Sequence, residues 1–505
     1  MTGTGIWDWG EMHGPVRKTL EGKENQNAYL TVCMALCLGV VLSLCLTLID
    51  GVRRNGARME VECVTEIGLQ SIMAEYHREL MRQYNLFAID TSYGTDRCSK
   101  TQTEEHLRSY LEKNLNYEDI FLSDYLYRDF LALSLEQAQL TKVSLMTDFD
   151  GAVFRRSAVD AVKADTGLGL LEEIRQWMGV IEVNGLEEGK EEEEKQRIDQ
   201  EIDAYDGMRV QVEEEEWETL SIRNPTAALE EKRRLGILKL VLEDEGALST
   251  GVLDLDSLVG NRMRRGQVNR GSMGMEEQTG MEGMVERFLF QEYLLRYMGH
   301  YGAENSQHAL HYQVEYLIAG NESDVDNLRS VANRICAVRE AANAIYLLSD
   351  EEKQTQIRLA AELVCTLVAL PELTPLLEGA ILLGWAFAES IYDVRSLLAG
   401  GRIPLLKDRE SWHYSLSGAL DGGLKEDTRE GEGLSYEDYL RIFMMFTDKD
   451  TITARAMDMV EADIRKTPGN EAFRLDGCCT EMEAYITMGS RYGFQYEVTR
   501  QKSYY

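Results

Sequence analysis

The stretch AYLTVCMALCLGVVLSLCLTLI, residues 28–49, limits how the rest of the chain can be arranged. Its 22 residues include no charged side chain, although the whole chain carries a net charge of −34. As an α-helix it would be about 33 Å long at about 1.5 Å per residue, enough to cross a hydrocarbon core of about 30 Å. The sequence contains no second run of this kind. It therefore predicts one transmembrane helix, with membrane lipid as a partner.

Retention of this helix as an anchor is the better interpretation of its length and flanks. The apolar core of a signal peptide has about 7 to 15 residues and precedes a small-x-small cleavage site. Here the run is longer and continues into DGVRR, residues 50–54. The positive-inside rule gives no orientation, because three basic residues flank the span on each side. These are Arg17, Lys18 and Lys23 before it, and Arg53, Arg54 and Arg58 after it.

Length and composition favour a mainly helical protein with two or three structural units. The chain has 505 residues, 44% of them apolar, and only six prolines. A chain of this size divides its core among several units, and scarce proline leaves long stretches free to be helical. The strong negative charge disfavours nucleic acid as a partner, because phosphate backbones would be repelled. Solubility explains such a surface, and a cation or a basic protein partner is the alternative.

The nine cysteines do not indicate a disulfide framework or a metal site. Three lie inside the apolar run, where a thiol behaves as a small hydrophobic group. The other six show no C-x-x-C spacing, and the sequence leaves their disulfide status open. They are Cys63, Cys98, Cys336, Cys365, Cys478 and Cys479.

After a tail of residues 1–27 and the helix of residues 28–49, residues 50–182 form a predicted membrane-proximal α+β region. Val61, Val64, Leu69 and Ile72 share one helical face, so an amphipathic helix is expected to leave the membrane, with Gly51 and Gly56 loosening the junction. Residues 131–145 alternate as a strand does, and breaks in phase after Leu135 and Leu140 indicate bulges or two strands. Helical spacing returns over residues 154–178.

Residues 183–283 form a predicted acidic and Gly/Met-rich insert, partly disordered. Residues 183–220 carry 15 acidic and four basic side chains, which is typical of solvated segments. A helix is expected to begin at Asn224-Pro225, a capping residue followed by proline, and to run through Leu240.

Residues 284–467 form a predicted helical domain. Ser349 and Glu352 have the spacing of a capping box. The apolar run of residues 379–388 is too short to cross a bilayer and is expected to be a buried core helix. Residues 468–505 form a predicted β-hairpin with its turn at Gly489 to Gly493, which pairs with the strand of residues 131–145.

Signatures of common enzymes are absent from the sequence, including H-E-x-x-H, G-x-S-x-G, C-x-x-C, G-x-G-x-x-G and the EF-hand loop. The segment GLEEGK, residues 185–190, is one residue too short for a phosphate loop and is followed by four glutamates that would repel phosphate. We therefore predict no catalytic, cofactor-binding or metal-binding residue.

Two weaker candidate sites remain in the helical domain. His308 and His311, with His300 nearby, could share a helix face as metal ligands, although surface or capped histidines are the simpler interpretation. Glu437 and Asp438 could act as an acid–base pair. The simpler alternative is that Ser435 caps a helix and the carboxylates favour its N-terminal dipole.

Several long segments resemble a Firmicutes family of single-pass membrane proteins that look like TadE/TadG-type proteins of tight-adherence (Tad, Flp) pilus loci. The resemblance rests on residues 29–90 (YLTVCMALCLGVV to NLFAID), 342–353 (ANAIYLLSDEEK), 380–407 (AILLGWAFAESIYDVRSLLAGGRIPLLK), 433–446 (GLSYEDYLRIFMMF) and 473–486 (FRLDGCCTEMEAYI). It implies a cytoplasmic N-terminus and an extracytoplasmic domain. One departure argues against prepilin-type processing, because Gly22 is followed by Lys23 and Glu24 and the span lacks a carboxylate.

These observations predict a non-enzymatic surface protein of the cell membrane, an accessory or assembly component of a Tad-like pilus or secretion apparatus. Its partners would be other single-span subunits that pack beside its membrane helix. The alternative is a membrane-tethered enzyme or metal-dependent sensor whose site lies in the helical domain, at His308, His311 or Glu437.

Overall fold

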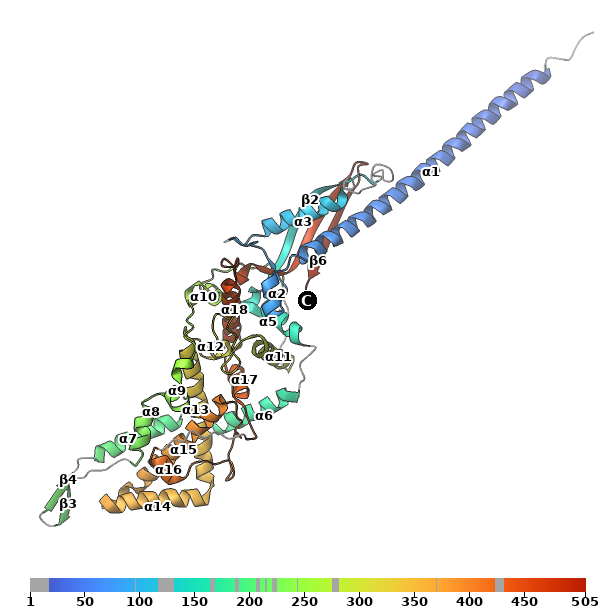
Figure 1. Ribbon diagram of the computed structural model, residues 1–505. Coiled ribbons are helices and arrows are strands. Elements are labelled where there is room, and N and C mark those ends of the chain that lie inside the picture. Colours follow the sequence, from blue (N-terminus) through green and yellow to red (C-terminus); the bar gives the residue numbers. More distant parts are fainter. Residues whose placement is uncertain are drawn as a thin grey trace, which may run out of the picture. The chain divides into compact units, whose positions relative to one another are not determined.

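The protein is mainly helical and carries a small antiparallel sheet (Figure 1). The computed structural model describes residues 18–95, 97–116, 131–163, 169–186, 190–205, 209–213, 216–219, 225–242, 244–274, 281–368, 370–422 and 431–505. The predicted α+β class is confirmed, with its long apolar N-terminal helix, its C-terminal strands in the sheet and its helical domain.

The described helices vary widely in length. They are α1 (Lys18–Met73), α2 (Arg78–Tyr84), α3 (Lys100–Leu115), α5 (Asp148–Val162), α6 (Gly169–Asn184), α7 (Lys190–Tyr205), α8 (Ala227–Arg233), α9 (Ile237–Val241), α10 (Val259–Arg264), α11 (Met281–Tyr297), α12 (Gln313–Ala319), α13 (Asp324–Ser349), α14 (Glu351–Val368), α15 (Thr374–Leu398), α16 (Leu416–Leu420), α17 (Tyr436–Phe446) and α18 (Lys449–Lys466). The strands are β1 (Ile89–Asp90), β2 (Leu133–Leu145), β3 (Arg209–Glu213), β4 (Glu216–Thr219), β5 (Cys478–Ser490) and β6 (Gln495–Ser503).

Residue contacts divide the chain into two compact units. The first comprises Met1–Ser71, Glu104–Gln139 and Ala484–Arg500, and the second comprises Ile72–Thr103, Leu140–Glu483 and Gln501–Tyr505. The sequence boundaries at residues 183, 284 and 468 are not tested by this division and stay predictions.

The apolar run forms the exposed part of α1. The helix from Tyr29 to Met73 is long and apolar enough to cross a membrane, with a mean hydropathy of 2.7 in its most apolar window and none of that window buried. A membrane anchor and a signal sequence both have this character. The helix continues unbroken through Gly51 and Gly56, so the expected loosening of the junction is wrong.

Beyond the apolar run, α1 becomes a core element of the first unit. The predicted apolar face is confirmed, because Val61, Val64 and Leu69 are all buried. At Gly68 the helix approaches α3 so closely that a Cβ would stand 3.2 Å from Cγ of Leu111. One helix therefore changes from fully exposed to closely packed along its length.

The main sheet has the strand order β1-β5-β2, and β6 pairs with β5. The predicted strand of residues 131–145, the C-terminal hairpin and their pairing are all confirmed. β1 was not predicted because it has only two residues, Ile89 and Asp90, which pair antiparallel with Cys479 and Cys478. The β5–β6 turn closes with a 2.7 Å hydrogen bond from Ser490 N to Phe494 O.

In the second unit, α15 is the central helix. It contacts α13, α14, α7, α9 and α16. The predicted core helix at residues 379–388 is confirmed, since Ile381, Trp385 and Ala388 are buried.

Three local predictions were wrong or fell partly outside the described residues. The helical pattern of residues 154–178 falls on two helices, α5 and α6, and residues 164–168 between them lie outside the described residues. The helix expected from Asn224 is two short helices separated at Gly236, whose φ of 89° does not fit a helix, and Asn224 lies outside the described residues. Asp350, and not Ser349, caps α14, because its Oδ1 accepts hydrogen bonds from the backbone of Glu352 and Lys353.

Candidate functional site

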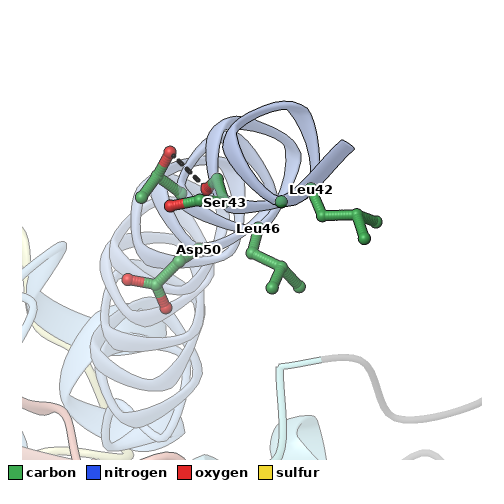
Figure 2. A pocket seen from close by; sticks show the side chains of 6 residues that line it. Leu42, Ser43, Leu46 and Asp50 are labelled. Carbon is green, nitrogen blue, oxygen red and sulfur yellow. Dashed lines mark hydrogen bonds between the residues drawn. The ribbon is translucent and has the colours of Figure 1, made fainter. Parts of the chain in front are cut away.

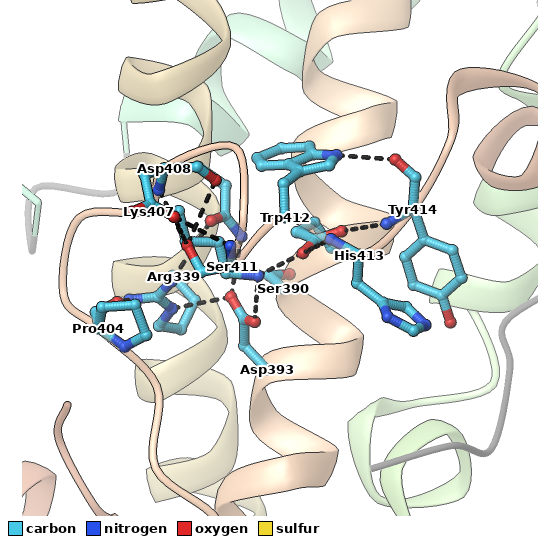
Figure 3. A network of polar contacts seen from close by, with 12 residues as sticks. Arg339, Ser390, Asp393, Pro404, Lys407, Asp408, Ser411, Trp412, His413 and Tyr414 are labelled. Carbon is cyan, nitrogen blue, oxygen red and sulfur yellow. Dashed lines mark hydrogen bonds and ion pairs between the residues drawn. The ribbon is translucent and has the colours of Figure 1, made fainter. Parts of the chain in front are cut away.

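Four charged side chains meet in the core of the second unit, and we call Arg339, Glu389, Asp393 and Lys407 the buried ion cluster (Figure 3). Arg339 Nε stands 2.9 Å from Asp393 Oδ2, and Lys407 Nζ stands 2.6 Å from Asp393 Oδ1. Lys407 also pairs with Glu389. All four side chains have an exposed fraction of 0%. Two positive and two negative charges therefore neutralise one another away from water.

Helix geometry brings the two carboxylates together. Glu389 and Asp393 lie four residues apart on α15, so they share one face of that helix. Arg339 projects from α13, the neighbouring helix, and Asn343 one turn later donates from Nδ2 to Asp393 Oδ2 at 3.1 Å. Lys407 comes from the segment that follows α15. The cluster thus joins two helices and one irregular segment.

The same cluster fixes the course of residues 404–414, as Figure 3 shows. Arg339 Nη1 donates to the carbonyl oxygens of Pro404 at 2.9 Å and Leu405 at 2.8 Å. The carboxylate of Glu389 accepts hydrogen bonds of 2.8 Å from the backbone N–H groups of His413 and Tyr414. The first end of this irregular segment is therefore attached to α13, and its last end is attached to α15.

Burial and charge act in opposite directions on the two carboxylates. Burial alone would raise the pKa of Asp393, but Arg339 and Lys407 together hold that pKa below its ordinary value. Burial raises the pKa of Glu389, and Lys407 only partly offsets the effect. Because every charge is paired internally and none faces solvent, the arrangement is typical of a structural clamp and unlike an open catalytic centre.

Aromatic side chains cover the cluster on the side of α14. The ammonium group of Lys353 lies 4.5 Å from the ring centres of both Trp385 and Trp412. Both indole N–H groups donate to the carbonyl oxygen of Tyr414, at 3.0 Å and 2.7 Å. Burial lowers the pKa of Lys353. These contacts add cation–π attraction and exclude water from the clamp.

The histidines proposed as metal ligands do not share a helix face, so that expectation is wrong. His308 and His311 lie in the irregular segment between α11 and α12. His308 is buried, with its Nε2 3.0 Å from Asn305 Nδ2 and 3.9 Å from Asp463 Oδ2, and burial lowers its pKa. In the part of the chain that the structure describes, no group of three or more His, Cys, Asp or Glu side chains could hold a metal ion.

The carboxylates near the start of α17 have a structural role. Ser435 Oγ accepts from the backbone of Asp438 at 3.2 Å, and Asp438 Oδ2 accepts from the backbone of Ser435 at 3.0 Å, which makes a reciprocal capping box. Arg441 pairs with Glu437 at 3.1 Å and with Asp438 at 3.2 Å. The interpretation of Ser435 as a helix cap is confirmed.

Sequence reasoning missed the buried ion cluster. One signal was available, because Glu389 and Asp393 directly follow the apolar run of α15 on a helix that must be buried. Charged residues in such a place need partners. Their partners Arg339 and Lys407 are distant in sequence, and no spacing rule identifies them.

A shallow depression lies on the exposed part of α1 (Figure 2). Gly39, Ser43 and Thr47 occur at intervals of four residues, and Leu42 and Leu46 line the adjacent edge. The hydroxyl of Thr47 donates to the carbonyl oxygen of Leu44 at 2.8 Å, so it is satisfied within the helix. The small side chains would allow another helix to approach closely.

Comparison with known proteins gives a family but no function. Residues 215–490, more than half of the chain, match the family described as a family of unknown function (DUF5702). No curated protein and no solved structure matches the chain. The match includes α13, α15, α17 and thus the whole buried ion cluster. The chain therefore belongs to the family of unknown function DUF5702.

Proposed function

We propose that this protein is anchored in the cell membrane by α1 and acts, without catalysis, as an extracytoplasmic structural or accessory component of a Tad-like pilus or secretion apparatus. The observation that carries the anchoring is the change of environment along a single helix. The residues from Tyr29 to Ile49 are exposed on α1, whereas Val61 and Leu69 of the same helix are buried. Lipid is the solvent that suits the first part.

The continuity of α1 favours an anchor over a cleaved leader. Cleavage near Asp50 would leave a helix that begins beside the core residues Ala57 and Val61, without its first turns, about nine at 3.6 residues per turn. An unbroken helix also transmits the position of the membrane to the first unit, because it lacks a flexible joint. This is the property expected of a protein that presents a domain at a fixed distance from a bilayer.

The proposed orientation and class of partner rest on the sequence resemblance to TadE/TadG-type proteins, which implies a cytoplasmic N-terminus. Nothing in the buried ion cluster favours an enzyme, because its charges are paired with one another. Other single-span subunits remain the proposed partners, in contact with α1 within the bilayer.

Membrane fractionation of the native chain tests the anchor. We expect the full protein to stay in the membrane pellet after washing at alkaline pH and high salt, and to enter solution only with detergent. Protease added to intact cells would degrade the domain while leaving a protected fragment that contains α1. Recovery of the intact chain in the aqueous extract would contradict the proposal.

Crosslinking in membranes tests the partners. The Gly39→Leu/Ser43→Leu variant fills the depression on α1, whereas Val41→Leu/Cys45→Leu introduces the same two leucines on the opposite face, at about 100° per residue. We expect the first variant to lose crosslinks to other single-span subunits and the second to keep them. Equal crosslinking in both variants, or recovery of the native chain with no component of the apparatus, would reject this part of the proposal.

A further inference from the structure

Directly after the apolar run, α1 carries arginines that stack on aromatic residues of the β5–β6 turn. The guanidinium of Arg53 lies 3.8 Å from the ring centre of Tyr492, and that of Arg54 lies 4.3 Å from the ring centre of Phe494. Arg54 also pairs with Asp50 at 2.9 Å. All of these residues belong to the first unit. Two segments that are distant in sequence therefore meet at the end of the predicted membrane helix.

Hydrogen bonds hold the turn against the helix. Tyr496 Oη donates to the carbonyl oxygen of Arg54 at 3.3 Å. On its other side, Ser490 Oγ donates to Leu131 O at 2.8 Å, and Arg491 N donates to Ala132 O at 3.0 Å. The turn is thus held by α1 on one flank and by residues 131–132 on the other.

The distance of the turn from the apolar run, measured along the axis of α1, matches the depth of the lipid headgroup layer. Arg53 follows Ile49 by four residues, which is about 6 Å along a helix axis. The polar headgroup layer adds about 5 to 8 Å to each side of the hydrocarbon core. If Ile49 marks the edge of the hydrocarbon, Arg53 and the aromatic rings of the turn lie within that layer.

The segment of α1 after the apolar run and the β5–β6 turn are positively charged, whereas the chain as a whole is strongly negative. Residues 50–58 and 490–495 together contain four arginines and one aspartate, although the whole chain has a net charge of −34. Arg491 and Tyr492 are exposed at the tip of the turn, and Tyr492 exposes 43% of its surface. Arginine binds phosphate through paired N–H donors, and aromatic residues concentrate at the membrane–water interface.

We propose that Arg53, Arg54, Arg58 and the turn from Ser490 to Gln495 form a collar that binds the phosphate groups of phospholipids. The collar deepens the proposed function and rests on it, because it requires α1 to lie in a bilayer. It fixes how far the helix is inserted and holds the first unit upright on the lipid surface. The acidic remainder of the protein is repelled from anionic lipid and stays in solution.

Depth-dependent fluorescence quenching tests the collar with the full chain reconstituted in vesicles of phosphatidylcholine and phosphatidylglycerol. The Tyr492→Trp variant keeps an aromatic ring over Arg53, and the signal of the six native tryptophans is subtracted with the unsubstituted chain. Ile67→Trp is the matched control, because Ile67 is exposed on α1 about 27 Å beyond Ile49. We expect phospholipids brominated near the headgroup to quench Tyr492→Trp at least about twofold more than Ile67→Trp.

A second pair of variants tests the role of charge. Arg491→Gln in the Tyr492→Trp background should reduce the additional quenching that phosphatidylglycerol gives over phosphatidylcholine alone, because the anionic headgroup loses one of the four arginines of the collar. Arg500→Gln, which removes an exposed arginine of β6, should leave that difference unchanged.

Two outcomes would overturn the collar, and they are distinguishable. If the protein floats with the vesicles but Tyr492→Trp is quenched no more than Ile67→Trp, the turn stands away from the bilayer and the collar alone is wrong. If the chain fails to float with the vesicles at all, the proposed membrane anchoring fails, and the collar fails with it.

Discussion

Two apolar helical runs, residues 28–49 of α1 and residues 379–388 of α15, have similar composition and opposite surroundings. No part of the most apolar window of α1 is buried, and Val40 exposes 70% of its surface. In α15, Ile381 and Ala386 are completely buried among other helices. Hydrophobicity alone does not say which solvent replaces water.

What distinguishes the runs is their length and the charges beside them. The run of α15 is followed by Glu389 and Asp393, whose charges are satisfied by Arg339 and Lys407 of the same unit. A helix can carry charge into a protein core only when such partners exist. The run of α1 carries no charge over 22 residues, and its described side chains from Tyr29 to Ile49 are exposed. Packed protein suits the run of α15, and lipid suits the run of α1.

Placing one carboxylate in each run gives the largest expected contrast. Ile381→Asp would bury an unpaired charge at a cost of several kcal/mol, against a total stability of about 5–15 kcal/mol, so we expect no cooperative thermal transition. Val40→Asp should leave the melting temperature of the detergent-solubilised protein unchanged. It should instead lower the fraction retained in membranes, because a charge at mid-bilayer costs about 2.5–3.5 kcal/mol.

The contrast would be lost if both variants unfolded alike. A low melting temperature for Val40→Asp in detergent would show that residues 28–49 pack against protein. A native-like transition for Ile381→Asp would show that the centre of α15 is not the core of the second unit.

Removal of one partner from the buried ion cluster has the next largest expected effect. Arg339→Met leaves Asp393 with Lys407 alone, and breaking a buried pair in this way costs about 3–5 kcal/mol. Arg409→Met is the control, since Arg409 pairs with Asp350 at 3.1 Å but exposes 67% of its side chain, and exposed pairs contribute about 0–1 kcal/mol. Urea unfolding would measure both. Equal losses in the two variants would mean that the cluster contributes no more than a surface pair.

The sequence predicts both apolar runs and the strands β2, β5 and β6, because each is encoded by neighbouring residues. The alternation of Met482, Ala484 and Ile486 is enough to predict β5, and its pairing with β2 follows because both strands need a partner. The exposed span and the core helix differ in length, which is also a local property. Apart from that pairing, these predictions depend on no contact between distant segments.

The parts that sequence reasoning missed depend on distant partners or on single backbone angles. Lys407 pairs with Asp393 only because the segment after α15 turns back over that helix. The break at Gly236 follows from one positive φ that no periodicity reveals. The arginines after the apolar run were used as topology signals, but their stacking on Tyr492 required the C-terminal hairpin to be placed beside α1.

The core contains buried carboxylates with and without strong cationic partners, and Asp393 and Asp458 are an example of each. Asp458 on α18 accepts hydrogen bonds from Gly260 N at 2.7 Å and Tyr316 Oη at 3.1 Å. Burial raises its pKa to about 7, although the hydrogen bonds from Gly260 and Tyr316 act to lower that pKa. Asp393, by contrast, has a lowered pKa because Arg339 and Lys407 outweigh its burial.

The raised pKa of Asp458 makes stability fall as pH rises. Folding favours the protonated form, so this contribution is complete below the ordinary pKa of 3.8 and is lost as pH rises through about 7. Between pH 6 and pH 8 the free energy of unfolding should fall by about 1.4 kcal/mol from this group alone. Asp458→Asn should remove that part of the slope in urea titrations at several pH values. An unchanged slope would contradict the assignment.

The smallest expected effect separates a helix cap from an acid–base pair at the start of α17. Ser435→Ala removes the hydroxyl that accepts from the backbone of Asp438, and loss of such a cap costs about 1 kcal/mol. Glu437→Gln should cost only a few tenths of a kcal/mol, because its pair with Arg441 is partly exposed. Urea unfolding of the two variants gives the order. If Glu437→Gln were the more destabilising, the carboxylate would have a role beyond its surface ion pair, because neither the capping box nor the helix dipole accounts for so large a loss.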